Sequence, residues 1–264
     1  MSRTRNTLTF AVAASIALAA TSVLLISRAA TKSSVDARRA QLPPRQSKVR
    51  NLSLHPEALS VSRRLGDRFK SVSRAVSTVA GTLTIDGNQM PLVLVRSQTD
   101  TGENVDIQAG NRGLKWNERA PLSATSERPS PAERVLAERL ILDSPDQFVL
   151  AQLRGAAYFT VARNVRPTDA GEGYNGPLWN MVRVDEPVPQ DESMRALSAW
   201  RIYYINVETG LPDRIEYQLN GQGIRTDFLE WIDQNGEKTP GHITWSSGGQ
   251  VIMDYTVRNI SHHQ

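Results

Sequence analysis

The sequence predicts an α+β protein, a predominantly antiparallel, unclosed β-barrel of about eleven strands with a central helix pair. An N-terminal transmembrane or signal helix is expected to precede this barrel. Three observations predict the arrangement: five strand-like runs separated by turns over 199–257, two adjacent helix starts over 130–146, and an uncharged segment over 8–26. Short strands separated by regular turn signals are typical of antiparallel sandwiches and barrels.

The clearest strands lie in the C-terminal quarter, where four successive hairpins are expected. Glycine and asparagine in each gap supply the positive-φ positions that tight turns need, and proline ends strands. The turn residues are Glu208-Thr-Gly210 with Pro212, Asn220-Gly-Gln-Gly223, Asn235-Gly236 with Pro240, and Ser247-Gly-Gly249. They bound strands near 199–206, 213–219, 224–231, 241–246 and 250–257.

Alternation along these strands assigns their faces. Tyr217 and Leu219 are expected to be buried, whereas Glu216 and Gln218 are expected to face water. A one-residue error in register would exchange the two faces. On the last strand, the predicted dry face consists of Val251, Met253, Tyr255 and Val257.

Two strands are apolar on both faces. In 199–206, Trp200 and Tyr204 oppose Tyr203, and in 224–231 Phe228 is flanked by Leu229. Such strands are covered on both sides by a second packing layer, or they line a second apolar space. The sequence does not decide between these two interpretations.

The first half of the body predicts a helix over 56–69 and strands near 75–85, 90–97, 103–109 and 113–117. Residues 118–130, with Pro121 and Pro129, are expected to form a loop. Ser130 is a suitable N-cap for a helix over 131–142, and Ser144 for a second helix that ends at Gly155. Two more strands, near 156–165 and 178–185, follow the helix pair.

Residues 8–26 form an apolar run without charge, preceded by Arg3 and Arg5 and followed by Arg28. This pattern predicts a membrane anchor or a cleaved signal peptide, with Ala17-Leu-Ala19 as a cleavage site. The domains are therefore expected to be 1–28 as anchor or signal, 29–50 as a basic disordered linker, and 51–264 as the barrel.

The sequence gives conflicting signals about the side of the membrane on which the barrel lies. The basic residues that follow the apolar run place the barrel in the cytoplasm if the positive-inside count is taken literally. The absence of cysteine and the strand-rich body favour the outside. We expect the barrel outside the cytoplasm, anchored to the inner membrane of a bacterial envelope, or periplasmic or secreted if the N-terminus is cleaved.

Composition excludes several classes of protein. The 31 basic and 27 acidic residues are nearly balanced, which does not suggest a nucleic-acid partner. Without cysteine there is no disulfide, zinc-thiolate site or lipidated cysteine. The four histidines show no metal-ligand spacing, and no GxSxG motif is present. Gly171–Gly176 spells a dinucleotide motif, but Pro177 follows it in place of a helix. No cofactor, metal or catalytic residue is predicted.

A family resemblance adds to this reading. It is carried by Leu211-Pro-Asp-Arg-Ile-Glu-Tyr217, Thr226-Asp-Phe-Leu-Glu-Trp231, Gly236-Glu-Lys-Thr-Pro240 and His242-Ile-Thr-Trp245, within the layout of strands, helix pair and long meander. This order resembles the LolA/LolB-like superfamily of periplasmic lipoprotein carriers. The resemblance implies an open barrel wrapped around helices, with acyl chains held between them. The chain lacks the lipidated cysteine of one family member and has an N-terminal segment that the diffusing carrier lacks.

The resemblance implies a tethered, non-enzymatic binder whose partner is a membrane lipid or an acylated protein. Two alternatives stand beside it: an envelope interaction or sensor module with a filled barrel, and an enzyme marked by clustered carboxylates in a pocket. The sequence leaves the oligomeric state open. Each proposed apolar lining residue is also a candidate core residue, and the set is Val135, Leu140, Phe148, Trp200, Tyr204, Tyr217, Leu219, Phe228, Trp245, Met253 and Tyr255.

Overall fold

The computed structural model describes residues 54–66, 76–99, 102–117, 120–124, 128–167, 173–186, 200–219 and 221–263. All of these belong to one compact unit, Gln46–Gln264. The predicted membrane segment 8–26 and linker 29–50 lie outside the described residues. Within the described ranges, no helix has the length and apolar character needed to cross a membrane.

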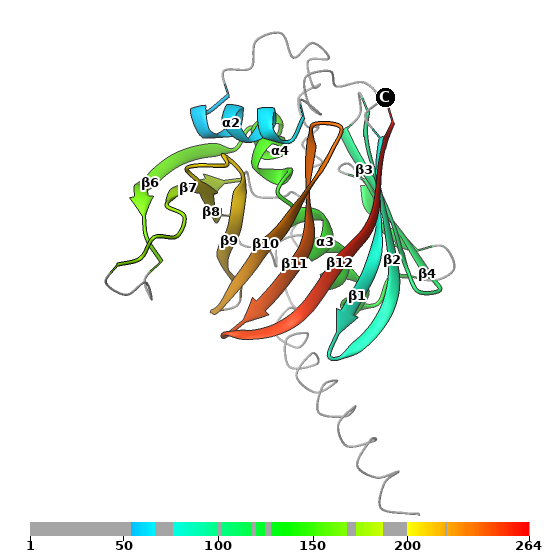
Figure 1. The fold of residues 1–264 in the computed structure, drawn as a ribbon. Helices are drawn as coiled ribbons and strands as arrows, with labels where there is room; N and C mark the ends of the chain where they lie inside the picture. Colours follow the sequence, from blue (N-terminus) through cyan, green and yellow to red (C-terminus); the bar gives the residue numbers. More distant parts are fainter. Residues whose placement is uncertain are drawn as a thin grey trace, which may run out of the picture. The chain divides into compact units, whose positions relative to one another are not determined.

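The described residues form one antiparallel sheet with three helices (Figure 1). The strand order is β5-β4-β3-β2-β1-β12-β11-β10-β9-β8-β7-β6. The helices are α2 (Pro56–Arg64), α3 (Pro131–Leu142) and α4 (Gln147–Leu153). The strands are β1 (Val76–Ile85), β2 (Asn88–Thr99), β3 (Gly102–Ala109), β4 (Arg112–Asn117), β5 (Ala120–Ala124), β6 (Ala157–Val165), β7 (Trp179–Asp185), β8 (Trp200–Asn206), β9 (Pro212–Leu219), β10 (Gln222–Gln234), β11 (Glu237–Ser247) and β12 (Gln250–His263).

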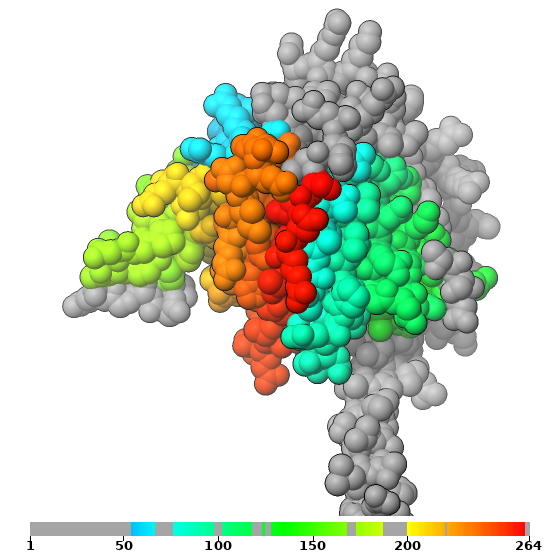
Figure 2. Space-filling view, turned by 45° about the vertical axis from the view of Figure 1, so that its right-hand side comes forward, coloured from blue at the N-terminus to red at the C-terminus, as the bar shows by residue number. Residues whose placement is uncertain are grey.

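The sheet joins two halves of the chain. Strands β1–β5 precede the helix pair and β6–β12 follow it, and β12 pairs with β1 at the seam. Figure 2 shows this seam on the surface, where β12 in red runs beside β1 in cyan. The end strands β5 and β6 do not pair with each other, so the sheet is not closed in the described part of the chain. This confirms the unclosed antiparallel arrangement expected from the sequence.

The sheet curves around α3 and α4, and its concave face packs on them in two apolar clusters (Figure 1). The first cluster joins α3, through Leu140 and Ile141, to β1–β4, β11 and β12. The second joins α2 and α4, through Val61 and Phe148, to β7–β10. Helix α3 therefore covers one part of the sheet, and α2 and α4 together cover the other part.

The helix pair begins and ends largely as its sequence predicts. The hydroxyl of Ser130 accepts from the Glu133 backbone N–H, and the Glu133 carboxylate accepts from the Ser130 N–H, which completes a capping box. The predicted start of the second helix was wrong. Helix α4 begins at Gln147, and Ser144 lies in the preceding turn without acting as a side-chain cap.

Several strand boundaries differ from the predictions, and two of the differences have a clear physical reason. The predicted loop 118–130 contains a twelfth strand, β5, which includes Pro121. Proline is tolerated there because an edge strand needs ladder hydrogen bonds on only one side. The last strand was predicted to end near 257, but β12 continues to His263, and His262 and His263 pair with Ser77 and Val76 of β1.

The face assignments hold on β9 and fail at one residue of β12. Tyr217 is buried and Leu219 is partly buried, whereas Gln218 is exposed. The assignment of Val251 was wrong, because it is 64% exposed although Met253 and Tyr255 on the same predicted face are buried. Its partner is Ser246, next to a register shift between Trp245 and Ser246, so alternation is interrupted between Val251 and Met253.

Candidate ligand-binding site

An opening in the sheet lies between β11 and β12. The two strands pair from Ser247–Gln250 back to His242–Thr256, and they separate beyond that point. Residues 237–241 of β11 continue beside β10, whereas β12 continues beside β1 to His263. Pro240 lies where the β11–β12 pairing has stopped, and it has no N–H to donate.

The other side of the opening depends on close approach between β1 and β12. A register shift at Ala80–Gly81 leaves Arg258 as an extra residue in β12. A Cβ atom at Gly81 would lie 2.1 Å from the Thr256 carbonyl oxygen, so only glycine fits there. The bulge at Arg258 lies just beyond Thr256, the last residue of β12 that pairs with β11.

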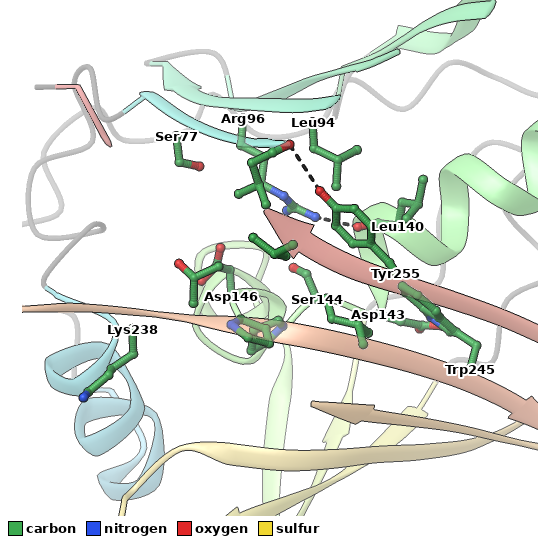
Figure 3. Close-up of a pocket in the computed structure, with 16 residues that line it drawn as sticks. Ser77, Leu94, Arg96, Leu140, Asp143, Ser144, Asp146, Lys238, Trp245 and Tyr255 are labelled. Atoms are coloured by element: carbon green, nitrogen blue, oxygen red, sulfur yellow. Dashed lines mark hydrogen bonds between the residues drawn. The ribbon is translucent and has the colours of Figure 1, made fainter. Parts of the chain in front are cut away.

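A cavity of about 50 Å³ lies at this opening (Figure 3). Its volume is below the roughly 300–1,000 Å³ of sites that enclose a whole small molecule. It is lined by β1, β2, β11, β12, the end of α3 and the turn between α3 and α4. The lining residues are Ser77, Val79, Leu94, Arg96, Leu140, Asp143, Ser144, Pro145, Asp146, Lys238, Thr239, Pro240, Ile243, Trp245, Tyr255 and Val257.

Arg96 fastens the C-terminal end of α3 to β2. Its guanidinium donates to the Leu140 carbonyl oxygen at 2.7 Å and to that of Ile141 at 3.2 Å. These helix-end carbonyls have no partner inside the helix, so a partly buried cation satisfies them. Arg96 also pairs with Glu103 at 2.8 Å, and Glu103 accepts from Gln147 of α4 at 3.0 Å. Burial raises the pKa of Glu103, and Arg96 opposes that rise.

Asp143 holds the α3–α4 turn against β8 and β9. One carboxylate oxygen lies 3.4 Å from Nε of Arg201, and the other accepts from the Tyr217 hydroxyl at 2.8 Å. Burial raises the pKa of Asp143, and the Arg201 charge opposes that rise. Both carboxylate oxygens of Asp143 therefore have partners. This geometry supports a structural ion pair and not a catalytic base.

Among the neutral side chains of the lining residues, three polar atoms are buried without a hydrogen-bond partner in the described part of the chain. They are the hydroxyl oxygens of Ser144 and Thr239 and the indole nitrogen of Trp245. Buried polar groups are nearly always hydrogen-bonded in native proteins. Each of these atoms is almost inaccessible to solvent, so none of them faces the open space of the cavity.

The structure places three of the predicted lining residues, Leu140, Trp245 and Tyr255, on the cavity wall. Met253 lies in the same apolar cluster as these three. Phe148, Tyr217 and Phe228 are buried in the second cluster, and Leu219 packs against it. These predicted lining residues therefore belong to two different apolar clusters, and only the first cluster borders the cavity.

The remaining predicted lining residues lie elsewhere. Val135 is 44% exposed on α3. Trp200 and Tyr204 lie on the outer face of β8, beside Arg183 and Arg214 respectively, with ring-to-guanidinium distances of 5.3 and 5.5 Å. They face outward because Arg201, Tyr203 and Ile205 take the inner face of the same strand.

Sequence reasoning did not find Arg96, Asp143, Ser144 or Thr239. A lone arginine on a strand, or an aspartate after a helix, is usually exposed to solvent. No local sequence pattern shows when such a residue is buried. The one local signal was Pro240, which was read as a strand terminator and instead lies within β11 beside the opening. In the described ranges, no group of three or more histidine, aspartate or glutamate side chains could hold a metal ion.

No protein-family model and no curated protein sequence matches the chain. Three solved structures are similar in fold. A DUF1329 family protein from Desulfovibrio piger has 9% identity and a TM-score of 0.47, covering 78% of this chain and 91% of its own. A LolA superfamily protein from Nitrosomonas europaea has 9% identity and a TM-score of 0.45, covering 80% and 95%. A domain assigned to outer membrane lipoprotein sorting in Vibrio parahaemolyticus has 8% identity and a TM-score of 0.46, covering 78% and 92%.

At these identities and TM-scores, the similarities concern the arrangement of elements alone. The architecture itself is an unclosed antiparallel sheet curved around a central helix pair. That is the fold implied by the sequence's resemblance to LolA/LolB-like proteins, so the fold expectation is confirmed.

Proposed function

We propose that the protein is a membrane-tethered, non-enzymatic binder of lipid-like or acylated ligands that works outside the cytoplasm. The main support is the opening between β11 and β12, which leads to an apolar space between the sheet and α3. Leu94, Leu140 and Val257 contribute apolar surface there. An acyl chain is the ligand whose shape and chemistry suit a narrow apolar entry.

A ligand of that length requires α3 to move, because the cavity of about 50 Å³ admits only part of an acyl chain. Apolar packing and the Arg96 hydrogen bonds to Leu140 and Ile141 hold α3 on β2. The sequence contains no cysteine, so no disulfide fixes the helix. An acyl chain that replaced these apolar contacts would gain about 0.8 kcal/mol for each buried CH₂.

The proposed tether is the apolar segment 8–26, connected through the basic linker 29–50 to the barrel 51–264. In this arrangement the barrel stays near the membrane surface, and its ligand is a membrane lipid or the acyl group of a protein. Basic residues in the linker favour anionic headgroups by about 1 kcal/mol each near the surface.

The direct test is displacement of a fluorescent fatty-acid probe by saturated acyl chains of increasing length. Residues 46–264 form a compact unit and are the segment to use. Affinity is expected to rise with chain length, by up to about fourfold for each CH₂. Absence of probe binding, or binding that does not depend on chain length, would contradict the proposal.

A second function is favoured by one specific observation, the small volume of the cavity. Trp245, Tyr203 and Phe148 are each fully buried and fill much of the concave side. A filled interior suits an envelope interaction or sensor module that binds its partner on the surface. The chain-length experiment separates the two candidates, because a filled module gives no dependence on acyl length.

A further inference from the structure

The two ends of the sheet differ in how well they are protected against pairing with another chain. Strand β5 has five residues, and one of them is Pro121, which has no N–H to donate. Strand β6, at the other end of the sheet (Figure 1), has nine residues without proline or lysine, and its only charged residue is Arg163. Natural proteins protect exposed sheet edges with short strands, proline and charge. Strand β5 has this protection, whereas β6 largely lacks it.

The first part of β6 is a regular strand with one edge open to a partner. Residues Ala157–Thr160 pair with β7 without interruption, and no strand in the described part of the chain pairs with the other edge. Beyond Thr160 the register shifts twice, and Asn164 has a φ of 52°. Such irregularities increase the local twist and disturb pairing. A partner strand is therefore expected at the middle of β6 and not at its far end.

Two apolar side chains of β6 are exposed beside this edge. Phe159 is 52% exposed, and Val161 is 51% exposed. Phe159 lies opposite Arg183 of β7. The guanidinium of Arg183 donates to Asp185 at 2.6 Å and lies 5.3 Å from the centre of the Trp200 ring. The neighbouring strand therefore leaves about half of the Phe159 side chain uncovered.

The spacing of these two residues makes β6 self-complementary. In an antiparallel pair with two-fold symmetry, residues at equal distances on either side of the axis lie opposite each other. An axis at Thr160 brings Phe159 of each copy opposite Val161 of the other copy, with the two threonines opposite each other. Aromatic residues beside β-branched residues, and threonine beside threonine, are favourable cross-strand pairs. Arg163 then lies opposite Ala157, so no like charges meet.

We infer that the free edge of β6 is a homodimer interface, at which two copies of the chain pair antiparallel about Thr160 and join their sheets into one. So short a strand pair buries less than the roughly 1,200 Å² of a stable specific interface, so the dimer is weak in dilute solution. The proposed membrane anchor would raise the effective concentration of one copy around the other. Strands β7–β10 lie between β6 and β11, so this pairing leaves the β11–β12 opening free.

The test is disulfide cross-linking of the full chain in the membranes of the expressing cells. The sequence contains no cysteine, so each variant has a single thiol. In Thr160→Cys the two Cα atoms are expected about 4.5–5.5 Å apart, which a disulfide can span. In Ala162→Cys they are expected about 14 Å apart, which a disulfide cannot span. With a mild oxidant, Thr160→Cys should therefore give at least about tenfold more covalent dimer than Ala162→Cys.

A charge on the edge tests the apolar contact. Val161→Lys, added to Thr160→Cys, should reduce the covalent dimer by at least about fivefold, because it removes both apolar cross-strand pairs. Val251→Lys is the matched control, since Val251 is a 64% exposed valine on β12, which lies at neither end of the sheet. It should leave the yield unchanged. Labelling with a maleimide corrects each yield for the reactivity of the thiol, and circular dichroism shows whether each variant is folded.

Three results would overturn the interface. The first is a covalent dimer that forms as readily in Ala162→Cys, or in Ser123→Cys on β5, as in Thr160→Cys, which would indicate random collision. The second is a Thr160→Cys dimer that Val161→Lys does not reduce. The third is absence of the dimer although the thiol of Thr160→Cys reacts with the maleimide, which would leave this edge to a different partner. None of these results concerns binding of a fatty-acid probe, so this interface and the proposed function can fail separately.

Discussion

Arg201 is 3% exposed, and its guanidinium lies between Asp143 and Glu186, each 3.4 Å away. Tyr217, which donates to Asp143, places its ring 4.9 Å from the same guanidinium. The interior of the barrel therefore contains a charged network between its two apolar clusters. Removing one member would leave another charge buried without its partner.

At the residue scale, alternation predicted Tyr217, Met253 and Tyr255 as inward-facing, and they are buried. Alternation left the faces of β8 open, because both contain apolar residues, and Arg201 takes the inner one. Arginine is rarely buried unless it is paired, and the partner of Arg201, Asp143, is 58 positions away in the sequence. Sequence alone does not show which charges meet in space.

Glu138 on α3 provides a prediction of pH dependence. Burial raises its pKa to about 7; Arg134 opposes the rise and Asp143 adds to it. Because the folded-state pKa lies above the unfolded value, the native state binds the proton more tightly, and stability falls as pH rises from about 4.5 to about 7. Glu138→Gln should remove this contribution.

The measurement is urea unfolding of wild type and Glu138→Gln at several pH values. The two proteins should differ least below about pH 4.5, and the variant should become relatively more stable as pH rises toward about 7. A stability difference that is constant over this range would show that Glu138 does not titrate in it.

At the scale of elements, turn chemistry and helix caps were the most informative signals. The capping box at Ser130 and the turn at Asn235-Gly236, where both residues have positive φ, appear as predicted. These signals did not predict strands whose formation depends on pairing with a neighbouring strand. β5 exists because β4 offers an edge, and the end of β12 is ordered by β1.

The attachment of the α3–α4 turn to β8 can be tested with two arginines. Arg201→Met should lower the unfolding free energy by about 3–5 kcal/mol, because it strands the buried Asp143. Arg183→Met is the control: Arg183 pairs with Asp185 at 2.6 Å, but the two side chains are 44% and 33% exposed. Chemical denaturation should show little change for the control. Equal losses in both variants would mean that burial does not determine the effect.

At the scale of the whole barrel, the number of strands was predicted to within one, and the helix pair was placed correctly between the two halves. The opening was not predicted. It depends on β12 staying paired with β1 as far as His263, whereas its pairing with β11 ends at Thr256. No local pattern in either strand specifies where the β11–β12 pairing ends.

The arrangement of the whole barrel also changes which of the predicted lining residues can contact a ligand. Val135 on α3 was expected to contact ligand, but it is 44% exposed, so its substitution should leave binding unchanged. Leu140, about one and a half turns further along the same helix, borders the cavity. The two positions therefore offer a matched pair for testing the interior as a ligand site.

Native mass spectrometry of the full chain, purified from the membranes of the expressing cells, tests the central claim most directly. We predict that wild type and Val135→Phe retain an added mass that fragments to an acylated molecule. Leu140→Phe, which fills the cavity, should lose that mass while keeping a folded charge-state distribution. Bare protein in all three samples, or retention of the added mass in Leu140→Phe, would contradict an acyl-binding interior reached between β11 and β12.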